Sequence, residues 1–183
     1  FTLLIQAGLF FSWVGDVALM FQHVDDFNFL IGLAAFLVAQ LCYSIGFIHN
    51  IMDGGPSRGD YLSALLAVGL LTIVYFFADM LVPKVEEGIT IPVLAYAGAL
   101  CLMGIAAAFR LGRTYLRSYL MIMVGASLFI TSDGLLAINR FVVPMESARW
   151  SIMLTYGIAQ LLIASGALVH VLDPEEIRRR AAL

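Results

Sequence analysis

The sequence predicts an all-α fold in which a bundle of helices crosses a lipid bilayer. Hydrophobic residues make up 62% of the chain and charged residues only 13%, whereas soluble domains carry about 25% charged residues. The apolar residues also form continuous runs, and roughly 20 such residues in a helix are enough to cross a bilayer. Because these runs do not alternate apolar with polar residues, they favour helices over a transmembrane β-barrel.

Six runs are long and apolar enough to be transmembrane helices, and together they predict a single transmembrane domain over residues 1–183. They cover residues 1–21, 29–49, 61–82, 91–109, 119–138 and 150–172. The turn-forming sequence at 53–57 separates the second run from the third. Pro92 is typical of the first turn of a helix, and Tyr119 and Trp150 open their runs as interfacial aromatic residues do.

The basic residues predict how the bundle is oriented. One side of the membrane holds both chain ends and seven basic residues: Arg58, Arg110, Arg113, Arg117, Arg178, Arg179 and Arg180. The other side holds three: Lys84, Arg140 and Arg149. Because cytoplasmic loops are enriched in Lys and Arg, we expect both ends in the cytoplasm, with residues 173–183 as a cytoplasmic tail. The expected location is the inner (plasma) membrane of a bacterium.

Several classes of protein do not fit this composition. A net charge of −3 without a long basic run argues against a nucleic-acid partner. His23, His49 and His170 are spread over both membrane faces, so we expect no metal site. The sequence contains no nucleotide-binding loop and no Gly-x-Ser-x-Gly motif, and no cofactor is expected.

Two pairs of neighbouring runs share a sequence pattern. Asp16 and Asp133 each follow a small residue and precede a leucine three positions later, and the next run in each case contains Ala-Gln-Leu, at 39–41 and 159–161. A displacement by four helices preserves orientation, which is typical of parallel membrane repeats. We therefore expect the last six helices of an eight-helix protein built as a parallel 4+4 repeat. Chance similarity between short apolar segments is the alternative.

The two aspartates are predicted to lie inside the membrane at similar depth. Asp16 and Asp133 each stand five residues before the predicted outward end of their helix, at residues 21 and 138. A carboxylate at the centre of a bilayer costs about 2.5–3.5 kcal/mol even on lenient scales. A matched pair therefore predicts one shared functional site. The alternative is a set of polar contacts between helices that serves packing alone.

Further polar side chains are expected to reach the same layer and to contact a ligand there. They are Ser12, Gln40, Tyr43, Tyr96, Ser132, Asn139, Arg140, Tyr156 and Gln160. Thr155 is expected to reach the layer as well. Among them, Arg140 is suited to bind an acid or a lipid phosphate, because a guanidinium forms charge-assisted hydrogen bonds to both.

Three segments carry a resemblance to a known family. They are Gly-Asp-x-x-Leu at 15–19, Ser-Asp-x-Leu-Leu-Ala-x-Asn-x-Phe at 132–141, and Thr-Tyr-x-x-Ala-Gln at 155–160. The sequence resembles the YhhN family, also called the TMEM86 or lysoplasmalogenase family, over nearly the whole chain. It departs from the family at Gln40, where members usually carry a histidine. Members also have an upstream Lys-Pro segment, and this chain begins after it.

The resemblance implies a membrane-embedded lipid hydrolase that cleaves the vinyl ether bond of a lysoplasmalogen to a fatty aldehyde and a glycerophospho-base. Its substrate would be a lysophospholipid or a related ether lipid, met among the membrane lipids. Vinyl ether hydrolysis requires a protonated carboxyl and a second, ionised one, and Asp16 and Asp133 are the candidates. Two alternatives remain: a non-catalytic subunit associated with a larger membrane complex, and a lipid or small-molecule transporter.

Overall fold

The computed structural model describes residues 1–25 and 27–172 and contains six helices long and apolar enough to cross a membrane. They are α1 (Thr2–Met20), α2 (Phe27–Gly54), α3 (Asp60–Leu81), α4 (Glu87–Ala108), α5 (Leu116–Ala137) and α6 (Ala148–Val171). A 3₁₀ turn, η1 (Val82–Lys84), follows α3, and a π-helix, η2 (Ile138–Val142), continues α5. The described residues contain no β-strand, so the predicted all-α, six-helix fold is confirmed. The predicted tail at 173–183 lies outside the described residues.

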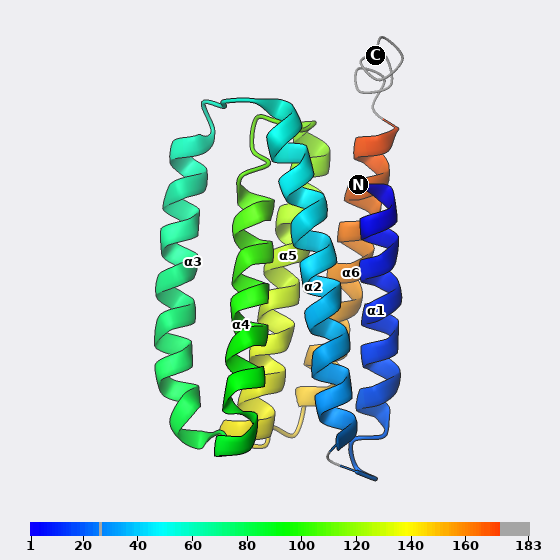
Figure 1. The fold of residues 1–183 in the computed structure, drawn as a ribbon, viewed down its shortest axis with the longest axis vertical. Coiled ribbons are helices and arrows are strands. Elements are labelled where there is room, and N and C mark those ends of the chain that lie inside the picture. The colour runs from blue at the N-terminus through cyan, green and yellow to red at the C-terminus, as the bar shows by residue number, and fades with distance from the viewer. Residues whose placement is uncertain (26, 173–183) are drawn as a thin grey trace.

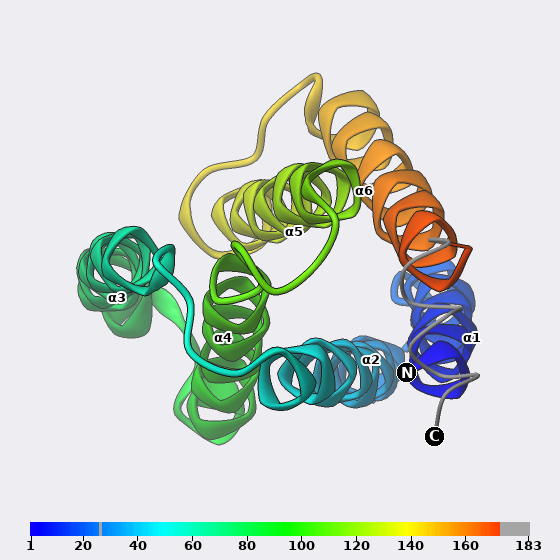
Figure 2. The same ribbon diagram turned by 90° about the horizontal axis from the view of Figure 1, so that it is seen from above.

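The six helices form a five-membered ring with one helix outside it. Successive helices run in opposite directions, so α1 begins and α6 ends at the same end of the bundle (Figure 1). In the ring, α1, α2, α4, α5 and α6 each pack on the next, and α6 closes on α1 (Figure 2). α3 stands outside and packs mainly on α4. Because α1 and α5 run in the same direction, their C-terminal turns lie at the same end of the bundle.

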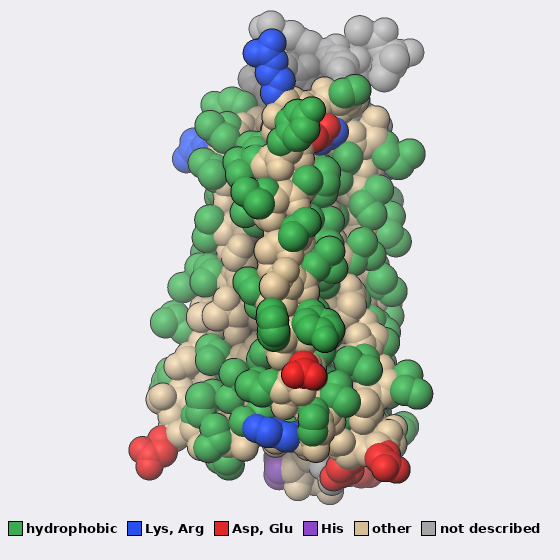
Figure 3. All heavy atoms as spheres, turned by 90° about the vertical axis from the view of Figure 1, so that its left-hand side faces the viewer, with side chains coloured by type: hydrophobic (Ala, Val, Ile, Leu, Met, Phe, Trp, Pro, Cys, Tyr) green, Lys and Arg blue, Asp and Glu red, His purple; other side chains and the backbone are tan. Residues whose placement is uncertain are grey.

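The outer surface is apolar along the middle of the bundle. On the face formed by α3, hydrophobic side chains cover the centre and most charged side chains lie toward the two ends (Figure 3). The exposed large side chains of α3 include Tyr61, Leu65, Ile73, Tyr75 and Phe76. A surface of this kind is unfavourable in water and suits contact with lipid tails. The chain is an integral membrane protein.

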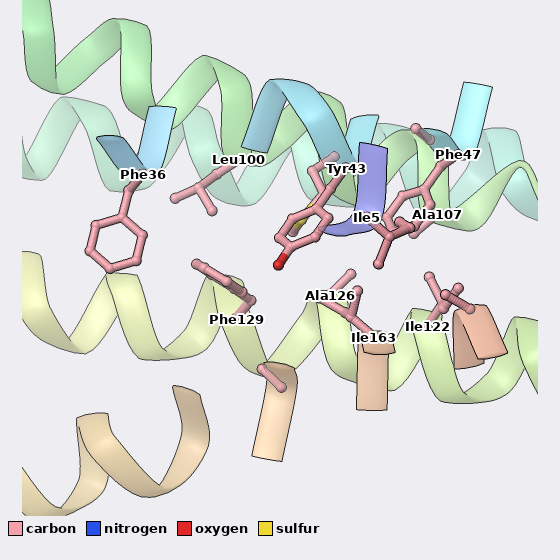
Figure 4. Packing of buried hydrophobic residues seen from close by; sticks show 14 residues of the cluster. Ile5, Phe36, Tyr43, Phe47, Leu100, Ala107, Ile122, Ala126, Phe129 and Ile163 are labelled. Carbon is pink, nitrogen blue, oxygen red and sulfur yellow. The ribbon is translucent and has the colours of Figure 1, made fainter. Parts of the chain in front are cut away.

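The interior of the ring is filled by side chains from all five of its helices. The core includes Ile5, Phe36, Tyr43, Phe47, Leu100, Ala107, Ile122, Ala126, Phe129 and Ile163 (Figure 4). Gly125 lets α5 approach α6 closely. A Cβ at this position would lie 2.9 Å from Ile163 Cγ1 and 3.0 Å from the Ala159 carbonyl oxygen. Small residues of this kind let membrane helices approach closely enough for backbone contact.

The two arginines that follow α4 occupy different environments. Arg113 forms an ion pair with Asp60, which ties the start of α3 to the connection between α4 and α5. Arg110 is fully buried, and its guanidinium donates hydrogen bonds to Asn50 Oδ1 at 3.2 Å and to Ser118 Oγ at 3.1 Å. The orientation prediction places Arg110 among the loop residues, but its buried side chain contributes no exposed charge to that side of the membrane.

Candidate active site

Asp16 and Asp133 lie in the wall of one cavity. Both aspartates occur in the last two turns of their helices, α1 and α5, and so stand at the same end of the bundle. The cavity has a volume of about 940 Å³, and its wall also contains Tyr96, Ser132 and Tyr156. Two side chains that are 117 positions apart in the sequence therefore share one cavity.

A chain of hydrogen bonds leads to Asp16. The Tyr156 hydroxyl donates to Asp16 Oδ2 at 2.8 Å, and Gln160 Nε2 donates to the Tyr156 hydroxyl at 3.1 Å. The Tyr43 hydroxyl donates in turn to Gln160 Oε1 at 2.7 Å. All three bonds point the same way, toward the carboxylate, and bonds aligned in a chain strengthen one another. Tyr43 is fully buried, so this network lies in the core of the ring.

Asp133 has a tyrosine partner of its own. The Tyr96 hydroxyl, carried by α4, donates a hydrogen bond to Asp133 Oδ2. Gln40 on α2 lies close to the same hydroxyl. Its side chain is fully buried, and neither amide atom forms a hydrogen bond of normal geometry. The residue at which this chain departs from the family's usual histidine therefore stands next to the Tyr96–Asp133 pair.

The two serines predicted for the site are both buried. Ser132 Oγ donates to the Ile152 carbonyl oxygen at 3.1 Å, and the Ser132 residue lines the cavity. Ser12 lies one turn before Asp16 and near the Tyr43 hydroxyl, although its Oγ atom forms no hydrogen bond of normal geometry. Thr155 Oγ1 bonds within its own helix, to the Ser151 and Ile152 carbonyl oxygens, and does not line the cavity.

The π-helix η2 carries Asn139 and Arg140 just beyond the end of α5 that holds Asp133. Asn139 lines the cavity, and its Oδ1 accepts a hydrogen bond from the Met145 backbone at 2.9 Å. Arg140 donates to Gln22 Oε1 at 3.1 Å, and its guanidinium carbon lies 3.8 Å from the centre of the Phe29 ring. Short π-helical turns are frequent at functional sites. Here the turn links α5 to the connection between α1 and α2.

The cavity wall contains polar residues that the sequence analysis did not place there. They are Gln22 and Arg149. His23 also lines the wall, and its position seven residues after Asp16 makes it a minor candidate for a proton carrier from the sequence alone. Arg149 precedes Tyr156 by seven residues, which puts both on one face of α6, and this spacing could have indicated it. No group of three or more potential metal ligands occurs among the described residues.

The fold and the cavity define a class: a polytopic membrane protein whose helices enclose a pair of aspartates near one end of the bundle. The YhhN family pattern matches residues 1–167. The chain belongs to the YhhN family, as its three motifs predicted. No solved structure matches it.

Relatives from mammals and bacteria carry the name of one enzyme. Lysoplasmalogenase TMEM86A of Bos taurus is 33% identical over 175 residues, which cover 94% of this chain and 68% of the relative. Lysoplasmalogenase TMEM86B of Rattus norvegicus is 34% identical over 168 residues, covering 92% and 63%. A lysoplasmalogenase of Mycobacterium tuberculosis is 30% identical over 141 residues, covering 75% and 50%. The chain thus spans about two thirds of the length of the mammalian relatives and half of the mycobacterial one.

Proposed function

We propose that this chain forms the catalytic part of a membrane-embedded lysoplasmalogenase, which hydrolyses the vinyl ether bond of a lysoplasmalogen or a related ether lipid. The observation that carries the proposal is the pair Asp16 and Asp133, which share one cavity and each accept a hydrogen bond from a tyrosine. The names of the mammalian and mycobacterial relatives support the same reaction.

Vinyl ether hydrolysis needs two groups with different tasks. A proton is first transferred to the β-carbon of the double bond, which leaves an oxocarbenium-like cation. Water then adds to the carbon bonded to oxygen and loses a proton, and the resulting hemiacetal breaks into a fatty aldehyde and a glycerol alcohol. One carboxyl must deliver the first proton, and a carboxylate must stabilise the cation and accept the proton from water. Glycosidases divide the work between two carboxyl groups in the same way.

The surroundings of the two aspartates support different roles for them. Both aspartates accept a tyrosine hydrogen bond, but the bond to Asp16 is the end of a chain of aligned donors through Gln160 and Tyr156. Aligned donors strengthen one another and so favour the ionised form of Asp16. Asp133 lines both the cavity and a neighbouring apolar groove, so it can approach a double bond that lies between a polar headgroup and a hydrocarbon chain. We assign proton delivery to Asp133, and stabilisation of the cation and activation of water to Asp16.

The test is aldehyde release from lysoplasmalogen by the purified full-length protein in detergent. Asp16→Asn and Asp133→Asn each keep the size of the side chain and remove its acid–base function. Each is expected to lower kcat by about 10²–10⁴-fold, the usual contribution of a general acid or base.

A matched control is Asp79→Asn. Asp79 lies on α3, is exposed and lines neither the cavity nor the groove, so the same chemical change there is expected to leave turnover unaltered. Full turnover by both active-site variants contradicts the two-aspartate mechanism. Absence of aldehyde from the wild-type protein contradicts the proposed reaction itself.

A further inference from the structure

We propose that the groove between α3, α4 and α5 binds the hydrocarbon chain of the lipid, while the larger cavity holds its polar headgroup. The inference rests on the proposed function, since it assigns the two ends of that substrate to two compartments of one site. The groove has a volume of about 260 Å³, and α3 contributes Ile73, Val74 and Phe77 to its wall.

The walls of the groove and the cavity differ in chemistry. Apart from Tyr96, Thr131, Asp133 and Arg140, every residue that lines the groove is apolar or glycine. The cavity wall instead includes Asp16, Gln22, His23, Asn139 and Arg149. A lysophospholipid has the same division, with a single apolar chain at one end and a charged headgroup at the other. The two compartments match its two halves.

The groove and the cavity meet at the Tyr96–Asp133 pair. Asp133 and Tyr96 line both of them, together with the apolar residues Phe29, Leu33 and Leu136. In a lysoplasmalogen, the vinyl ether bond joins the hydrocarbon chain to the glycerol headgroup. A lipid with its chain in the groove and its headgroup in the cavity therefore has its reactive bond at the boundary. The acid assigned to deliver the proton stands at that boundary.

The placement of α3 outside the ring also fits a site for a hydrocarbon chain. α3 lies outside the ring and packs mainly on α4, and its connections hold it at both ends, through η1 and through the Asp60–Arg113 pair. α3 stands apart from α5 in Figure 2. Its residues Ile73, Val74 and Phe77 line the groove. A hydrocarbon chain gains no hydrophobic energy by leaving the bilayer for such a groove, since lipid tails are equally apolar. The groove therefore acts to position the bond.

Filling the groove tests this assignment. Val74→Phe adds bulk to the wall of the groove that α3 forms. Val68→Phe is the matched control, because Val68 is exposed on the same helix and lines neither compartment. Val74→Phe is expected to raise KM for a hexadecenyl lysoplasmalogen about tenfold, a typical effect of steric misfit in an apolar pocket, and to alter KM for an octenyl analogue much less.

A second pair of variants probes the opposite wall. Ala97 on α4 lines the groove, whereas a Cβ on the adjacent Gly98 would meet no atom within 4 Å. Ala97→Leu is expected to reproduce the dependence on chain length, and Gly98→Leu to behave as wild type. An equal effect of Val74→Phe and Ala97→Leu on both substrates, or no effect on either, overturns the proposal.

Photolabelling gives a readout that does not depend on turnover. The probe is a non-cleavable alkyl-ether lysophospholipid with a diazirine at the end of its chain, added to the full-length protein. Labels on the facing sides of α3 and α4 support the proposal, whereas labels spread over all lipid-exposed helices overturn it. Labelling in the groove without aldehyde release supports the site for the hydrocarbon chain and contradicts the proposed hydrolase activity. Aldehyde release with labels elsewhere supports the hydrolase activity and contradicts the site for the hydrocarbon chain.

Discussion

Each candidate catalytic aspartate receives its hydrogen bond from a tyrosine on a different helix. Tyr156 on α6 donates its hydrogen bond to Asp16 on α1, and Tyr96 on α4 donates to Asp133 on α5. A carboxylate held by a neighbouring helix cannot rotate freely, and a fixed carboxylate is better placed for proton transfer. We therefore propose that the tyrosines position the two carboxylates. Each bond also joins two helices of the ring.

Loss of the Tyr156 hydroxyl is expected to weaken catalysis without unfolding the protein. Tyr156→Phe removes the bond to Asp16 and interrupts the chain of donors that begins at Tyr43. A hydrogen bond to a charged group contributes about 1.5–3 kcal/mol, so kcat is expected to fall about 10- to 100-fold, with KM nearly unchanged. Tyr75→Phe is the control, since Tyr75 is exposed on α3. A loss confined to KM would show that Tyr156 binds substrate instead of orienting Asp16.

The sequence was informative about single polar residues and less so about their contacts. An acid inside an apolar run is conspicuous because its burial is unfavourable, and that marks Asp16 and Asp133 as candidate site residues. The link from Tyr43 through Gln160 depends on how α2 and α6 are rotated about their axes, which is set by packing against neighbours. Arg110 was misplaced for a similar reason, since its position after α4 does not reveal that its side chain turns into the bundle.

Among the helices, the pair α5 and α6 depends most clearly on small residues. A Cβ on Gly166 would lie 2.7 Å from Ile122 Cγ1, and one on Gly125 would lie 3.0 Å from the Ala159 carbonyl oxygen. Backbone atoms cannot move aside as a flexible side chain can. These two helices carry Asp133 and Tyr156, so their spacing also sets the width of the cavity.

Gly125→Ala is expected to destabilise the bundle. The added methyl group forces α5 away from α6, and overpacking of this kind costs about 1–3 kcal/mol. For a chain of this size that lowers Tm by about 2–12 °C, at 2–4 °C per kcal/mol, measured by thermal unfolding in detergent. Gly69→Ala is the control, because a Cβ on Gly69 would meet no atom within 4 Å. Equal melting of the two variants would mean that the close α5–α6 contact does not limit stability.

At the scale of the whole molecule, the α1–α2 pair resembles the α5–α6 pair in packing as well as in sequence. Gly8 and Gly125 each stand eight residues before an aspartate. A Cβ on Gly8 would meet the Tyr43 ring, and a Cβ on Gly125 would meet Ile163. Tyr43 and Ile163 each follow the glutamine of Ala-Gln-Leu by three residues. This correspondence supports a duplication of the helix pair, while the complete 4+4 repeat stays a prediction.

The orientation of the bundle decides which leaflet supplies the substrate. With Arg110 buried, the described residues leave three basic side chains at each end: Arg58, Arg113 and Arg117 at one, and Lys84, Arg140 and Arg149 at the other. The predicted bias toward a cytoplasmic location of both chain ends therefore rests on the arginines at 178–180. If the bias holds, the cavity opens toward the outer leaflet, since both aspartates lie at the end opposite to where α1 begins.

Labelling with a membrane-impermeant maleimide measures this orientation. Arg117 and Glu86 are exposed at opposite ends of the bundle, next to the starts of α5 and α4. In a protein whose native Cys42 and Cys101 are replaced by alanine, Arg117→Cys is expected to react only after the cells are opened, and Glu86→Cys in intact cells. The reverse pattern would place the cavity toward the cytoplasm, and the enzyme would then draw its lipid from the inner leaflet. The contacts of Asp16 and Asp133 are the same in either orientation, so this experiment determines the leaflet independently of the mechanism.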